Sequence, residues 1–187
     1  MKTRFLLPCA LLVLSCVILH SGCSLRPESS TPPAPTPLSA QAIYDRTAAN
    51  FHQPAAEARG AEQARLLTEA AAGYEHVLKR FPRETNVCLL ATRGLANVRA
   101  SQGRIDDAVR IHVSLTNLPA ASDWDRLIAL KSAADLLWDA RREAEAKPLY
   151  HQLVESFDRP GVSQMTQTIV RGSRTRLDAL TVRESRP

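Results

Sequence analysis

Apolar residues between about residues 39 and 182 recur every three or four positions, which is the spacing of one helical face. No stretch of this region shows the alternation of apolar and polar positions that is typical of a half-buried strand. One helical face occurs three times, at a constant interval along the chain. Its members are Ala70, Tyr74 and Val77, then Ala108, His112 and Leu115, then Ala146, Tyr150 and Leu153. The pattern predicts an all-helical domain that contains three equivalent helices.

Prolines and a glycine mark where these helices end. Pro82, Pro119 and Pro160 each follow one of them, and the residue before a proline is disfavoured in a helix. Gly103 stands where a glycine commonly ends a helix. Between these markers the sequence predicts three partner helices, at residues 85–102, 123–139 and 163–182. One more helix is predicted before the first repeat, at residues 39–52. The predicted unit is therefore a helical hairpin.

The last predicted helix has no partner after it. Stacked repeats need a polar outer surface at their ends to remain soluble. We expect this helix to cover the end of the stack and to present a charged outer face formed by Arg171, Arg174, Arg176 and Asp178.

The order of small and large residues in these hairpins resembles the tetratricopeptide repeat family. The match is fullest in the middle unit, at Leu95, Ala96, Gly103, Ile105, Ala108, His112 and Leu115. The third unit departs from the family pattern at Arg141, where glycine is usual, and at Pro148, which lies inside a helix. The resemblance implies an all-α fold, a short right-handed stack of about three helical hairpins followed by a terminal helix.

Residues 1–22 have the order of regions of a signal peptide. Lys2 and Arg4 precede an uncharged apolar run that is shorter than the roughly 20 residues a membrane-spanning helix needs. The residues before Cys23 resemble the lipobox of bacterial lipoproteins, whose cysteine is acylated and becomes the mature N-terminus. Cys16 fits that motif more strictly, because His20 stands where the motif before Cys23 wants an apolar residue. We expect Cys23 to carry the lipid, with Cys16, an ordinary signal or a retained anchor as alternatives.

The chain divides into four parts. The proline-rich segment begins only after Cys23, which favours this cysteine over Cys16, and such a segment is an extended spacer with a reach on the order of 40 Å. Cys88 is the other cysteine of the mature chain, so no intramolecular disulfide is expected. The predicted parts are a signal peptide (1–22), a lipid-anchored linker (23–38), a helical repeat domain (39–182) and a flexible tail (183–187).

Charge and motifs exclude several classes of function. Removal of Lys2 and Arg4 leaves 22 basic and 19 acidic residues, an excess too small to predict a nucleic-acid partner. The sequence contains no paired-histidine zinc motif, P-loop, nucleophile elbow or dinucleotide fingerprint. His112 shares the position of Tyr74 and Tyr150, which favours a packing role. We therefore expect no cofactor, no bound metal, no catalytic residue and no enzymatic activity.

The tetratricopeptide resemblance also implies a binding groove, because in that family the first helices of successive units line a concave surface. It carries this role to Arg93, Asn97, Lys131, Asp135 and Trp138. Arg93 followed by Asn97 resembles the start of the family's carboxylate clamp, and Ser132 departs from that pattern. We expect a groove that takes an extended segment or a helix through polar contacts and Trp138. An ordinary solvated face is the alternative.

These inferences predict a protein-binding scaffold that a lipid anchors to the bacterial cell envelope, with an envelope protein or peptide segment as partner. Lipoproteins of this class aid the assembly of outer-membrane or secretion complexes. Ser24 after the acylated cysteine resembles outer-membrane sorting, which implies the periplasmic face of the outer membrane. A peptidoglycan-associated enzyme, or an accessory of one, is the alternative.

Overall fold

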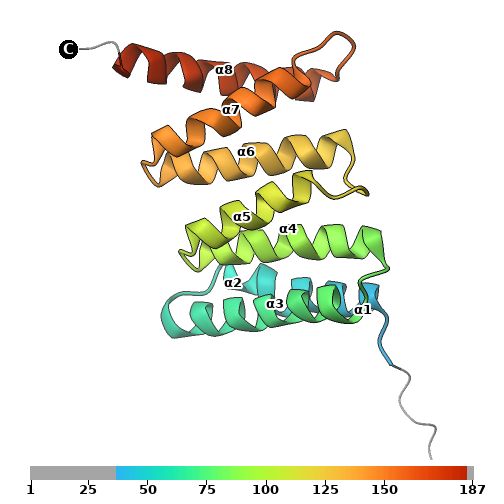
Figure 1. The fold of residues 1–187 in the computed structure, drawn as a ribbon. Helices are drawn as coiled ribbons and strands as arrows, with labels where there is room; N and C mark the ends of the chain where they lie inside the picture. The colour runs from blue at the N-terminus through green and yellow to red at the C-terminus, as the bar shows by residue number, and fades with distance from the viewer. Residues whose placement is uncertain (1–36, 185–187) are drawn as a thin grey trace, which may run out of the picture. The chain divides into compact units, whose positions relative to one another are not determined.

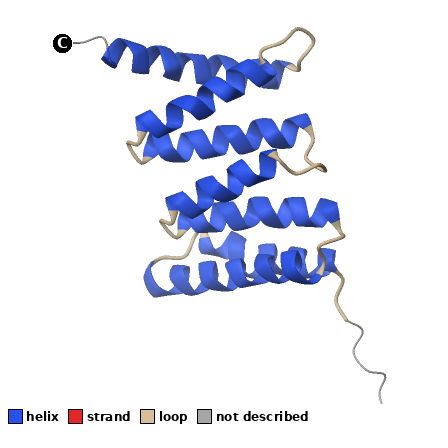
Figure 2. Cartoon of the chain, in the orientation of Figure 1, coloured by secondary structure: helices blue, strands red, loops and turns tan. Residues whose placement is uncertain are grey.

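The computed structural model describes residues 37–184, and in this range the chain is helical with no strand (Figure 2). The predicted signal peptide, the lipid acceptor and the linker up to residue 36 lie outside the described residues. The last helix continues two residues beyond the predicted domain end at 182. The elements are α1 (Ala40–Thr47), the π-helix η1 (Ala48–His52), α2 (Gln53–Ala55), α3 (Gly60–Arg80), α4 (Thr85–Ser101), α5 (Ile105–Thr116), α6 (Asp123–Asp139), α7 (Glu143–Phe157) and α8 (Gln164–Glu184).

Each long helix packs against the next one along the chain, from α3 to α8 (Figure 1). In addition, α1 contacts both α3 and α4, and α6 contacts α8 directly. The prediction of an all-α stack of helical hairpins is confirmed. None of the described helices is both long and apolar enough to cross a membrane.

The face that repeats in α3, α5 and α7 forms the centre of the stack. Its alanines are fully buried, its aromatic residues are 1% exposed, and its aliphatic residues are at most 2% exposed. Residues four and three positions apart lie above one another on a helix, so each equivalent helix buries one stripe against its two neighbours. These buried residues are Ala70, Ala108 and Ala146, Tyr74, His112 and Tyr150, and Val77, Leu115 and Leu153.

The turns after α4 and α6 have the same backbone hydrogen bonds. In both, the turn residue donates to the carbonyl three residues earlier, and the following residue donates to the carbonyl five residues before it. The turn residue is Gly103 after α4, with a φ of 74°, and Arg141 after α6, with a φ of 62°. Glycine adopts this left-handed conformation freely, whereas a residue with a Cβ does so at a cost.

Replacing Arg141 with glycine is expected to raise the free energy of unfolding by about 1 kcal/mol, because it relieves that cost. Urea denaturation of the two proteins measures the difference. The matched change, Gly103→Ala, should lower the free energy of unfolding by a similar amount. A destabilised Arg141→Gly protein would show that the arginine side chain contributes more than its backbone strain costs.

The stack ends at α8, because the outer side of this helix carries polar residues in place of apolar ones. The helices α6 and α8 begin after Ser122 and Ser163, whose hydroxyls accept the N–H three residues later at 3.2 and 3.1 Å. With these two serines aligned, residues of α6 that are buried against α7 correspond to exposed polar residues of α8. The pairs are Leu127 and Thr168, Leu130 and Arg171, Ala134 and Thr175, and Leu137 and Asp178. A further helix would find no apolar surface there, as predicted for Arg171 and Asp178.

Candidate functional site

The five predicted groove residues lie on two first helices of the hairpins, with Arg93 and Asn97 on α4 and the others on α6. Arg93 Nη1 is 3.6 Å from Asp125 Oδ1 of α6, so the two first helices lie side by side at this point. Asn97 is exposed. We define the first-helix face as the side of the stack that carries Arg93, Asn97, Lys131, Asp135 and Arg176 on α4, α6 and α8.

Asp135 is the centre of a polar cluster on this face. Its carboxylate accepts a hydrogen bond from Lys131 Nζ at 2.5 Å and another from the Tyr150 hydroxyl at 2.7 Å. Arg176 of α8 donates both to this carboxylate and to the Tyr150 hydroxyl oxygen. Hydrogen bonds between charged groups are stronger than neutral ones. The carboxylate therefore links α6 to α7 and to the terminal helix.

Trp138 forms the aromatic part of the same cluster. Its ring lies edge-on to the Tyr150 ring, with 6.2 Å between the centroids. The Arg176 guanidinium lies 5.4 Å from each of these two ring centroids, which is cation–π geometry. Arg183, which pairs with Glu143 at 2.5 Å, approaches the Trp138 ring at 5.9 Å. Half-buried Trp138 is thus in contact with side chains of α7 and α8.

Two tyrosines in equivalent positions keep their hydroxyl protons. Burial raises the pKa of Tyr150 above its ordinary value, and the hydrogen bond to Asp135 raises it further. Tyr74 bonds His52 Nδ1 at 2.8 Å, and burial raises the pKa of Tyr74 to about 12. A protonated phenol can donate to a carboxylate or to an imidazole nitrogen. The Tyr150 hydroxyl therefore connects α7 to α6, and the Tyr74 hydroxyl connects α3 to η1.

A cavity of about 190 Å³ opens beside the Asp135 cluster. Lys131, Asp135 and Tyr150 line it from α6 and α7, and Ile169 and Arg176 are among its α8 residues. Sites for drug-sized ligands have volumes of about 300–1,000 Å³. The cavity therefore has the size for one side chain or one terminal group of a partner.

Arg176 was predicted on the outer face of α8, and this prediction is wrong. The helix before α8 is three residues longer than its equivalent, since α7 has 15 residues and α5 has 12, so the interval from Ser122 to Ser163 exceeds that from Ala70 to Ala108 by three positions. The longer spacing makes Arg176 the equivalent of Asp135. Alignment of the two serines would have identified this relation from the sequence. Tyr150 was assigned to packing alone, because spacing does not report where its hydroxyl points.

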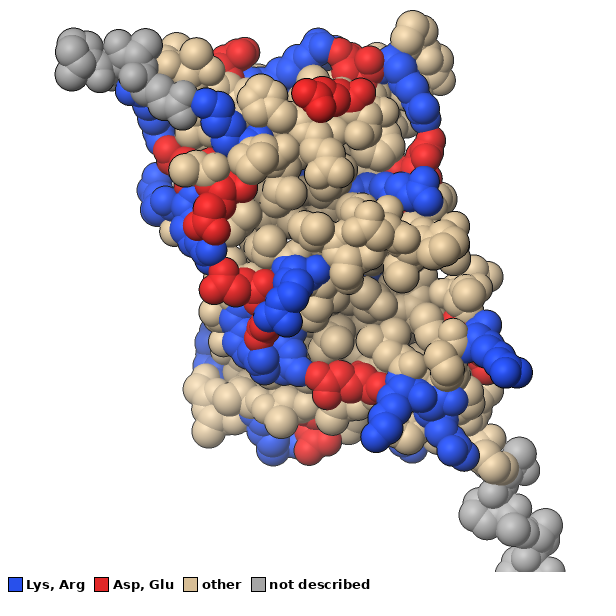
Figure 3. All heavy atoms as spheres, in the orientation of Figure 1, with Lys and Arg blue, Asp and Glu red and all other residues tan. Residues whose placement is uncertain are grey.

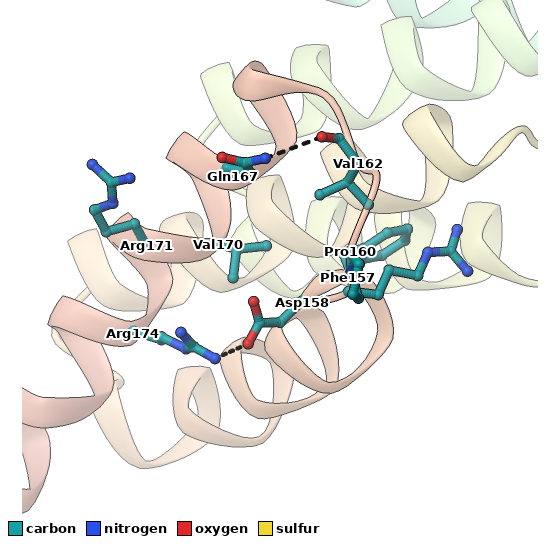
Figure 4. Close-up of a pocket in the computed structure, with 9 residues that line it drawn as sticks. Phe157, Asp158, Pro160, Val162, Gln167, Val170, Arg171 and Arg174 are labelled. Carbon is teal, nitrogen blue, oxygen red and sulfur yellow. Dashed lines mark hydrogen bonds and ion pairs between the residues drawn. The ribbon is translucent and has the colours of Figure 1, made fainter.

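A second cavity, of about 390 Å³, lies at the loop between α7 and α8 (Figure 4). Arg174 pairs with Asp158 across it, and the Gln167 side chain donates to the Val162 carbonyl at 3.2 Å. Val170 supplies part of the apolar wall. These polar contacts hold the loop between α7 and α8 against the first turns of α8.

Charged side chains of both signs lie around the edges of the face shown in Figure 3, whereas its middle is largely uncharged. Some charged side chains form ion pairs between successive hairpins. Arg142 pairs with Asp106 at 2.6 Å, and Arg183 pairs with Glu143. Exposed pairs of this kind contribute little individually. They connect residues 36 to 40 positions apart and so follow the repeat.

His112 fills the slot that tyrosine occupies in the neighbouring units, and its predicted packing role is confirmed by an exposure of 1%. Its Nδ1 is buried and has no hydrogen-bond partner among the described residues. Burial, with a further contribution from the positive charge of Arg93, lowers the pKa of His112 to about 4. The folded protein therefore holds this imidazole in its neutral form.

We expect His112 to make stability depend on pH. In the unfolded chain its pKa is near 6.5, so the unfolded state binds the proton first and stability falls as the pH drops from about 6.5 towards 4. Relative to a His112→Leu variant, the protein should lose about 2 kcal/mol of unfolding free energy between pH 7 and pH 5. Urea titrations at several pH values measure this difference. The control is exposed His151→Gln, and equal pH slopes for the His112→Leu variant and the original protein would contradict the assignment.

Comparisons with known proteins give no relative for this chain. No protein-family model, no curated protein and no solved structure matches it. Within residues 37–184, no three His, Cys, Asp or Glu side chains are grouped so that they could hold a metal ion. The proposals below rest on the sequence and on the contacts described above.

Proposed function

We propose that the protein is a lipid-anchored scaffold of the bacterial cell envelope that binds a segment of another envelope protein on its first-helix face. The observation that carries this proposal is the cavity beside the Asp135 cluster, which is lined from α6, α7 and α8. Several rigid helices contribute to this surface, so a partner would meet side chains that packing already holds in place.

The chemistry of the face suits an extended segment. The Lys131 side chain is 42% exposed and that of Arg176 is 34% exposed, so each retains donor groups that Asp135 does not use. Asn97 occupies the position in α4 that is equivalent to Asp135 in α6, and its side chain offers an amide there. A partner peptide offers backbone carbonyl oxygens as acceptors for such donors. One of its side chains could enter the cavity of about 190 Å³ while its backbone meets the exposed donors.

Photo-crosslinking in cells tests the binding face. A photoreactive amino acid at exposed Asn97 should capture a protein partner, whereas the same group at exposed Gln152 on α7 should not. An Arg93→Glu variant should reduce the crosslink at position 97, because it reverses a charge on the same face. If positions 97 and 152 capture the same proteins in equal yield, the first-helix face is not the binding surface.

The envelope anchor is supported by the order of regions up to Cys23 and by the proline-rich segment that follows. Metabolic labelling with palmitate is the direct measurement. The chain should incorporate label, Cys23→Ala should abolish it, and Cys16→Ala should retain it. Loss of label only in Cys16→Ala would move the acceptor to that residue, and absence of label in the unchanged chain would refute the anchor.

A further inference from the structure

A groove of about 730 Å³ lies between α1, η1 and the C-terminal half of α3. Its apolar lining includes Leu38, Ile43, Phe51 and Phe81. The last three pack against the core of this end of the domain, whereas Leu38 is 45% exposed. The groove is therefore an exposed continuation of the core and offers apolar surface to a ligand.

Two arginines give the groove a cationic rim. Arg46 and Arg80 line it, and both are exposed. Neither side chain forms an ion pair or hydrogen bond with another residue of the described part. Glu69 and His76 also line the groove, so one acid faces two arginines. The combination of apolar lining and a net positive rim is complementary to an anionic amphiphile.

The backbone beside the groove has an irregular helical form. Phe51 belongs to the π-helix η1, which follows α1 without a break. Turns of π-helix in longer helices are frequent at functional sites. The irregular turn thus coincides with the residues that line the groove.

The position of the groove indicates where a ligand would come from. Pro37, the first described residue, lines it together with Leu38. In the proposed function the chain before Pro37 runs to a lipid on Cys23. A proline-rich spacer of this length reaches on the order of 40 Å or less. The tether therefore keeps this groove within about 40 Å of a bilayer.

We propose that the groove binds an anionic phospholipid of that bilayer. Acyl carbons would cover Leu38, Phe51 and Phe81, and the phosphate would lie between Arg46 and Arg80, whose guanidinium groups suit phosphate oxygens. This inference rests on the proposed membrane anchor. An apolar peptide segment is the competing occupant. Arg46 and Arg80, which form no ion pair within residues 37–184, favour the phospholipid.

Site-specific crosslinking of the full chain in cells tests the inference. A diazirine amino acid at Leu38 should give an adduct with the mass of a phospholipid. The matched control is the same group at Met165, which is 60% exposed on α8 and should give little adduct. Replacing Arg46 and Arg80 together with glutamine should lower the adduct at position 38 on the order of tenfold. The exposed Arg83→Gln change, outside the groove, should leave it unchanged.

The other outcomes are equally informative. Three results would overturn the inference. They are a protein adduct at position 38, equal yields of lipid adduct at positions 38 and 165, and a lipid adduct whose yield is unchanged when Arg46 and Arg80 are replaced with glutamine. If position 38 instead crosslinks to the lipid that the chain itself carries, no phospholipid mass is added. That result would also overturn the inference, because the groove would hold the chain's own lipid. Palmitate labelling reports on the anchor separately. Labelling without a lipid adduct refutes the groove alone, and an adduct without labelling refutes the anchor alone.

Discussion

Gly73→Ala is expected to lower the free energy of unfolding by about 3 kcal/mol. Gly73 lies in α3 where α1 crosses it, and a Cβ built there would be 2.2 Å from Thr47 Oγ1 and 2.6 Å from its Cγ2. Thr47 is 3% exposed, and its hydroxyl donates to the Ile43 carbonyl at 2.7 Å, so it has little room to move. The two helices would have to separate. Urea denaturation monitored by circular dichroism measures the loss.

Gly172→Ala is the matched control, because Gly172 also lies inside a helix and a Cβ there would meet no atom within 4 Å. Alanine has a higher helix propensity than glycine, so this variant should be more stable by up to about 1 kcal/mol. Similar effects at the two positions would mean that the contact between Gly73 and Thr47 is not tight in solution.

Asp135→Ala is expected to cost about 2.5 kcal/mol of unfolding free energy. The change leaves the Tyr150 hydroxyl without its acceptor and removes the anion that Lys131 and Arg176 share. Because these bonds connect α8 to the rest of the stack, amide hydrogen exchange in α8 should accelerate more than exchange in α3.

Asp178→Ala controls for the loss of one negative charge, since Asp178 is exposed on the outer side of α8. Substitutions at such surface positions change stability by about 0.5 kcal/mol or less. If the two aspartate variants are equally stable, the cluster does not hold the terminal helix. Asp135 would then be available to a partner, as the tetratricopeptide resemblance implies.

The repeated face explains how much of the fold can be predicted from the sequence. Three buried residues at positions i, i+4 and i+7 recur at a constant interval, and a helix is the conformation that brings such positions together. The ends of the predicted helices from α3 onwards agree with the structure to within a few residues. The helix predicted at residues 39–52 is also present. Within it α1 passes into the π-helix η1, which the sequence did not indicate, because a single π turn leaves too short a pattern to recognise.

The candidate site was less predictable for a geometric reason. Lys131 and Asp135 are four residues apart on one helix, so their pairing follows from local spacing. Arg176 joins them from a position 41 residues away from Asp135, and its direction depends on α7, which is three residues longer than α5. Trp138 was an anchor candidate from its residue type, and its contacts with α7 and α8 depend on how those helices pack.

The sequence by itself determined the helical class, the hairpin repeat, the buried stripe and the polar end of the stack. These features follow from local periodicity, which each helix expresses without reference to distant residues. Only the tertiary structure decided that Asp135 is shared by three helices, that a buried nitrogen of His112 has no hydrogen-bond partner within residues 37–184, and that a groove lies between α1 and α3. Those features depend on distances between helices, and side-chain packing across the stack sets such distances.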